Sequence, residues 1–88
     1  MLRSAAGEFG TMAAQISGFD RITFEADKMG GRACIRGLRI TVGLILSLLS
    51  EGASAEEILR EYPDLELDDI RQSLAYAAWL SREDVLPA

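Results

Sequence analysis

The chain contains no histidine, and Cys34 is its single cysteine. These counts exclude a disulfide framework, a zinc site built from cysteine and histidine, and acid–base catalysis by histidine. Most classes of enzyme are removed with them. We therefore expect a protein that is not an enzyme and that has no catalytic residues, no bound metal and no cofactor.

Long hydrophobic runs are also missing. The longest apolar segment, residues 42–49, reads VGLILSLL, whereas roughly 18 to 20 apolar residues are needed to cross a bilayer. The first eleven residues, MLRSAAGEFGT, lack the apolar centre of a signal peptide. Together with an unpaired thiol, this favours the cytoplasm, where cysteines stay reduced.

The sequence has the length of one small domain. Of its 88 residues, 49% are hydrophobic and 26% charged, which is typical of a folded domain. We interpret residues 1–11 as a vector-derived leader, because GEFGT resembles translated cloning sites. The expected domain spans residues 12–82, followed by a flexible tail over residues 83–88. Since so small a core is marginal, we expect a homodimer.

The net charge of −5 is divided unevenly along the chain. Residues 12–43 carry five basic and three acidic side chains, a charge of +2, whereas residues 44–88 carry three basic and ten acidic ones, a charge of −7. A basic N-terminal segment and an acidic C-terminal segment suit a protein that binds an anionic partner through one of its faces. In the alternative interpretation these charges only make a small domain soluble, and composition does not distinguish the two.

Short strands are expected before the helices. Residues 21–25, RITFE, alternate polar and apolar side chains, which predicts a half-buried strand. Gly30, Gly31 and Gly37 then predict an irregular loop, and the β-branched residues 40–42 predict a second strand. Two such strands are stable only when they pair or pack on other elements.

Two helices follow from local signals at their ends. Thr41 is a candidate N-cap for a first helix over residues 42–49, and Gly52 is its C-terminal stop. This helix is apolar nearly all round. Ser54 and Glu57 have the spacing of a capping box, which predicts the start of a second, short helix.

A third helix is expected after Pro63, from about Leu67 to Arg82. The three helices together have the outline of a helix-turn-helix core. The periodicity predicts a buried stripe of Leu67, Ile70, Leu74, Ala77 and Ala78. The outward side chains would then include Asp68, Asp69, Arg71, Gln72 and Ser73.

Three segments carry a resemblance to a known family. They read GGRACIRGLRITV at residues 30–42, SAEEILREYPDL at residues 54–65 and DDIRQSLAYAAW at residues 68–79. As a set they resemble the bacterial domain-of-unknown-function family 433 (DUF433), whose members are small VapB-like antitoxins. The resemblance extends over residues 18–82.

The resemblance implies a mainly α fold, a homeodomain-like or winged helix-turn-helix core with one or two short N-terminal β-strands. It also implies a function, as the antitoxin of a type II toxin–antitoxin pair that neutralises a PIN-like ribonuclease, with promoter DNA as a second ligand. Two alternatives stay open. One is a transcriptional regulator without a toxin, and the other is a dimerisation or scaffold module that binds no nucleic acid.

The strongest chemical signal lies in the glycine-rich loop, which carries Arg32, Arg36 and Arg39. Guanidinium groups bind phosphate and carboxylate groups bidentately. The three arginines are therefore candidate DNA contacts, and Arg36 and Arg39 are also candidates for neutralising the acidic site of a nuclease. In the alternative interpretation Arg39 pairs with Asp20 or Glu25 and only ties the loop to the first strand.

Further candidates lie on the helices and the tail. Arg71 and Gln72 suit guanine and adenine edges, although their neighbours are acidic. Cys34 is interpreted as a small buried hydrophobic residue. The remaining candidates are Trp79, Arg82, Val85 and Leu86 for binding a partner protein, and Leu44, Leu48 and Tyr76 for a dimer interface.

Overall fold

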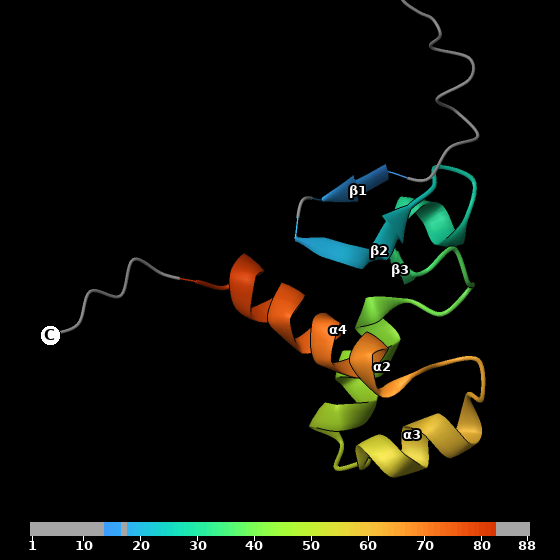
Figure 1. Cartoon of the computed structure of the whole chain (residues 1–88), viewed down its shortest axis with the longest axis vertical. Helices are drawn as coiled ribbons and strands as arrows, with labels where there is room; N and C mark the ends of the chain where they lie inside the picture. The colour runs from blue at the N-terminus through green and yellow to red at the C-terminus, as the bar shows by residue number, and fades with distance from the viewer. Residues whose placement is uncertain (1–13, 17, 83–88) are drawn as a thin grey trace, which may run out of the picture.

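The computed structural model describes residues 14–16 and 18–82 (Figure 1). In these residues a small sheet precedes three α-helices, so the fold is mainly helical, as the sequence predicts. The strands are β1 (Ala14–Ile16), β2 (Phe19–Phe24) and β3 (Ala33–Ile35), with a 3₁₀ helix η1 (Met29–Gly31) before β3. The α-helices are α2 (Val42–Ser50), α3 (Ala55–Glu61) and α4 (Leu67–Leu80).

The three strands form one antiparallel sheet with β2 in the middle. Ile22 of β2 lies opposite Ile35 of β3, and both side chains are fully buried. In Figure 1 the sheet lies at one end of the domain and α3 at the other, with α2 and α4 between them. The sheet therefore covers one end of the helical core.

The predicted second strand is misplaced. It was expected over residues 40–42, but the strand that pairs with β2 is β3, and Thr41 makes only an isolated bridge with Cys34. The described residues also hold three strands, where one or two were predicted. The β-branched residues favour a strand locally, but Thr41 caps α2, and Val42 is its first residue.

The helix boundaries agree closely with the sequence prediction. The Thr41 hydroxyl accepts a hydrogen bond from the Leu44 amide at 3.0 Å, as expected of an N-cap. The capping box of α3 is present, with the Glu57 amide donating to Ser54 and the Ser54 amide donating to Glu57. These signals act over three residues, which is why the sequence alone reveals them.

The predicted buried stripe of α4 is wrong in part. Leu67 and Leu74 are 42% and 48% exposed, whereas Asp69 and Ser73, expected to face outward, are fully buried. Ile70 is buried as predicted. The buried side of α4 therefore differs from the predicted side. Asp69 faces the core because its charged partners lie in the sheet region, and the apolar pattern of α4 gives no information about them.

The core combines residues from the sheet and from all three α-helices. Each pair of helices is in contact, α4 packs on β2, and α2 packs on β3. None of the helices in the described residues is long and apolar enough to cross a membrane. The buried apolar residues that form the core cluster are Ile22, Ile35, Val42, Ile45, Ile58, Leu65, Ile70 and Tyr76.

Candidate functional site

The three loop arginines lie in different environments. Arg32 is exposed, and its guanidinium contacts the carbonyl oxygen of Met29 at 3.4 Å. Arg39 is exposed too, and no side-chain hydrogen bond or ion pair joins it to the described residues. Its alternative pairing with Glu25 is not found there, and Glu25 pairs with Lys28 at 3.3 Å. Of the three, only Arg36 forms an ion pair with a buried side chain of the described residues, that of Asp69.

Arg36 and Arg21 hold the buried carboxylate of Asp69. Nη2 of Arg36 donates to Oδ2 of Asp69 at 2.8 Å, and its Nε donates to Oδ1 at 3.1 Å. On the same carboxylate, Nη1 of Arg21 donates to Oδ1 at 2.8 Å, and the Glu66 amide donates to Oδ2 at 2.8 Å. Asp69 is fully buried with both oxygens hydrogen-bonded, as a buried charge requires. We call Arg21, Arg36 and Asp69 the Asp69 cluster.

A tight turn places Arg36 in this cluster. The Leu38 amide donates to the Ile35 carbonyl at 2.7 Å, and φ is 45° at Arg36 and 73° at Gly37. Two central residues of positive φ are typical of a type I′ turn, which glycine adopts readily and arginine rarely. The Arg36 guanidinium also donates to the carbonyl oxygen of Asp64 at 2.6 Å. The turn is thereby joined to the segment before α4.

Electrostatics in the cluster stabilise the ionised carboxylate. Burial disfavours the charge on Asp69, but hydrogen bonds from Arg36, Arg21 and the Glu66 amide outweigh this effect and lower the pKa of the carboxyl. Hydrogen bonds to Glu66 and Asp69 raise the pKa of Arg21, and the hydrogen bond to Asp69 raises that of Arg36. The cluster is thus fully charged at neutral pH.

The lowered pKa of Asp69 predicts a loss of stability in acid. An unfolded aspartate titrates near pH 3.9, so the contribution of Asp69 is complete above about pH 4 and is lost as the pH falls through the lower folded pKa. Urea unfolding at a series of pH values from about 6 to about 2 measures this loss. The Asp69→Asn variant is the control, since it cannot titrate there. Equal pH dependence in both proteins would contradict the prediction.

Arg71 and Gln72 were expected to face the bases of DNA. The Gln72 amide is instead used within the protein, because its oxygen accepts from the Arg21 amide at 2.6 Å and its nitrogen donates to Asp20 at 3.0 Å. The Arg71 side chain is 71% exposed and lies 3.7 Å from Asp68. The start of α4 therefore offers one exposed arginine among carboxylates.

The residues predicted for a dimer interface are not equally accessible. Tyr76 is only 9% exposed, and its ring makes an edge contact with Phe19 at 5.4 Å between centroids. Tyr76 thus belongs to the core of the single chain, and its contact with a second subunit stays a prediction. Leu44 and Leu48 of α2 are half-buried. Aromatic packing with the sheet accounts for Tyr76.

The residues expected to bind a partner protein lie at the end of α4. Trp79 is 39% exposed and packs on Phe19, with 5.6 Å between ring centroids. The Arg82 guanidinium lies 5.2 Å from the centroid of the Trp79 ring, within the range of a cation–π contact. Val85 and Leu86 lie outside the described residues.

An apolar groove, which sequence reasoning missed, lies between α4, the start of α2 and the sheet. Its volume is about 570 Å³. Arg32 lies on its lining, and Leu80, 60% exposed, lies there too. Leu80 lies off the predicted buried stripe of α4, and this was the available signal. Its apolar lining comes from Phe24, Ala33, Val42, Leu46, Tyr76, Ala77 and Leu80.

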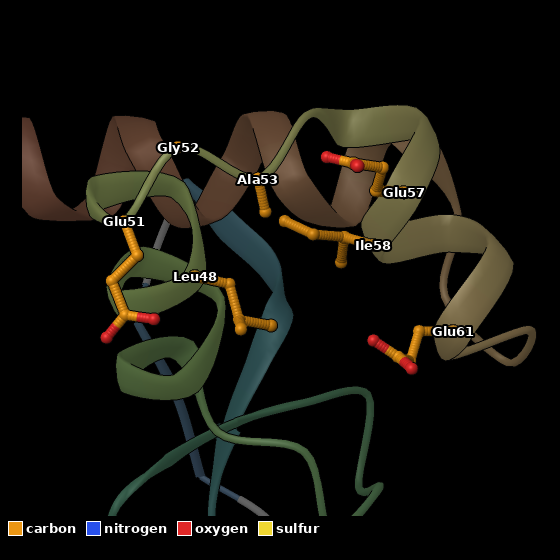
Figure 2. A pocket seen from close by; sticks show the side chains of 7 residues that line it. All are labelled: Leu48, Glu51, Gly52, Ala53, Glu57, Ile58 and Glu61. Atoms are coloured by element: carbon orange, nitrogen blue, oxygen red, sulfur yellow. The ribbon is translucent and has the colours of Figure 1, made fainter.

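A second hollow, between the end of α2 and α3, has a volume of about 360 Å³ and is bordered by carboxylates. One of them, Glu57, already accepts the Ser54 amide at 2.7 Å in the capping box. Within the part of the chain that the structure describes, no three metal-binding side chains come together. The lining residues, shown in Figure 2, are Leu48, Glu51, Gly52, Ala53, Glu57, Ile58 and Glu61.

Cys34 is buried in β3, 1% exposed, as the sequence predicts. Burial raises the pKa of its thiol, so the thiol stays protonated at neutral pH. A protonated, inaccessible thiol is a poor nucleophile. Cys34 therefore contributes packing.

Comparison with known protein families gives a match. The family described as "Protein of unknown function (DUF433)" matches residues 22–77, which include the Asp69 cluster apart from Arg21, and most of the apolar groove. The chain matches no curated protein. It matches no solved structure either.

Proposed function

The chain belongs to the DUF433 family, and from this premise we propose that it is an antitoxin that binds and neutralises a PIN-like ribonuclease. The observation that carries the proposal is the apolar groove with Arg32 on its lining. Exposed apolar surface bordered by charge is typical of sites that bind another protein. The groove thus suits a partner segment that presents apolar side chains next to a carboxylate.

The exposed arginines supply the charge for such a complex. A PIN-like nuclease gathers acidic side chains around its metal ions, and an arginine that enters this site neutralises it. Arg36 is unsuited to this role because Asp69 and the carbonyl of Asp64 already bind its guanidinium. Arg32 and Arg39 are exposed and remain the candidates.

Promoter DNA is a weaker candidate for the main ligand. In a helix-turn-helix arrangement α4 is the helix that enters the major groove. Glu66 and Asp68 at its start are 61% and 63% exposed, and they repel phosphates. Gln72 is occupied within the protein. These charges favour a protein partner over nucleic acid.

The test is coexpression with the product of the neighbouring open reading frame. We expect that product to stop growth when expressed alone, and to be silenced and co-purified when this chain is present. In titrations of its ribonuclease activity, Arg32→Ala with Arg39→Ala is expected to weaken inhibition by at least about tenfold, since arginines are frequent hot spots. Melting temperature should stay unchanged.

Arg60→Ala is the matched control. Arg60 is exposed on α3, which does not line the apolar groove, so its removal should leave inhibition intact. A neighbouring product that is neither toxic nor co-purified would reject the antitoxin proposal. Full inhibition by the double variant would reject the role of the two arginines.

A further inference from the structure

The outward side of α4 carries apolar residues that no described element covers. Leu67 and Leu74 are 42% and 48% exposed, and Ala78 is exposed as well. Residues spaced by seven and by four lie on one side of a helix. Asp69 and Ile70 occupy the opposite side, in the core. We define the outer face of α4 as Leu67, Arg71, Leu74, Ala75 and Ala78.

We propose that the outer face of α4 binds the same face of a second copy of this chain, with the two helices antiparallel. The charges at the two ends of α4 point to this partner. Asp68, in the first turn of α4, lies seven residues before Ala75, and Arg82, two residues beyond the last residue of α4, lies seven residues after it. A two-fold axis beside Ala75 therefore brings Asp68 of each subunit opposite Arg82 of the partner subunit. A two-fold interface requires such self-complementarity.

Both charged groups are available for this pairing. Asp68 lies 3.7 Å from Arg71 and 3.8 Å from Arg21, distances longer than a hydrogen bond, so its carboxylate can still accept one. Arg82 is exposed, and its guanidinium is held at the end of α4 by the Trp79 ring and by a hydrogen bond from Nη1 to the Trp79 carbonyl at 3.2 Å. The other N–H groups of the guanidinium can still donate. The small side chain of Ala75 at the axis permits close approach of the two helices.

The area buried between the two α4 helices limits the affinity of the proposed dimer. With 14 residues, α4 is about 21 Å long. A single helix pair of this length buries less than the roughly 800 Å² per subunit of a standard interface. The dimer is therefore reversible and dissociates on dilution. This inference does not rest on the antitoxin proposal, which uses the apolar groove.

Sedimentation of the full chain between about 1 µM and about 1 mM tests the proposal. The protein alone should pass from monomer to dimer over this range. Leu74→Glu should weaken the dimer by at least about tenfold, because it brings two carboxylates close to each other on either side of the axis. Leu80→Glu is the matched control, since Leu80 lies on the same helix but lines the groove. It should leave the dimer unchanged.

A charge exchange tests the antiparallel arrangement. Asp68→Arg and Arg82→Asp should each weaken self-association by about threefold to tenfold, because each places like charges in contact twice. A mixture of the two variants should associate as heterodimers at least as well as the unchanged protein. In the mixture every contact again joins an arginine and an aspartate. Circular dichroism confirms that each variant is folded.

Three results would overturn the proposal. One is a monomer at all concentrations, and another is a dimer that Leu74→Glu leaves intact or that Leu80→Glu weakens equally. The third is a mixture of the charge variants that associates no better than either alone. Each result can occur while the antitoxin proposal stands, because toxin binding is measured separately. Conversely, a confirmed dimer with no toxic neighbour would reject only the antitoxin.

Discussion

Replacing Asp69 with alanine is expected to leave a large fraction of the protein unfolded at room temperature. The substitution removes the carboxylate that binds Arg21, Arg36 and the first turn of α4. Arg36 then loses its ion pair, whereas Arg21 keeps Glu66 at 2.8 Å. Breaking a buried ion pair from one side costs about 3 to 5 kcal/mol. A core of this size supplies only about 3 to 5 kcal/mol in total. Far-UV circular dichroism and urea unfolding measure the effect.

Asp69→Asn is the control for this prediction. Asparagine has the same shape and accepts hydrogen bonds, but it lacks the charge that balances two arginines. We expect stability between that of the alanine variant and that of the unchanged protein. An alanine variant that melts within about 3 °C of the unchanged protein would show that the Asp69 cluster is dispensable.

Arg36→Ala is expected to lower the melting temperature by about 10 °C, whereas Arg39→Ala should change it by less than about 3 °C. The two arginines are three residues apart in the same loop, but only Arg36 is bound to Asp69. Its side chain is 35% exposed and Arg21 remains, so the loss is smaller than for Asp69 itself. Differential scanning calorimetry of both variants tests the contrast.

The contrast decides how partner experiments with this loop are interpreted. A defect of Arg36→Ala in binding a toxin or DNA would report unfolding as much as a lost contact. A defect of Arg39→Ala at unchanged melting temperature would report a lost contact. Equal melting temperatures for the two variants would contradict the structural role assigned to Arg36.

The sequence predicted which residues are candidates for the functional site, but not how they are arranged. The sequence points to Arg32, Arg36 and Arg39 because three guanidinium groups lie among glycines. It does not show that one of them is used inside the fold, since nothing near Arg36 in the chain marks its partner. The apolar groove was missed because its walls come from two strands and two helices. The outer face of α4 was missed because its leucines were assigned to the core.

The sequence by itself determined where the helices begin and end and that Cys34 is a packing residue. Caps such as Thr41 and Ser54 act on amides three residues away, so their effect is local. Only the tertiary structure decided which side of α4 is buried. Asp69 meets Arg36 across 33 residues and Arg21 across 48. Those two charges turn a carboxylate into the core and leave Leu67 and Leu74 on the surface, which no periodicity within α4 encodes.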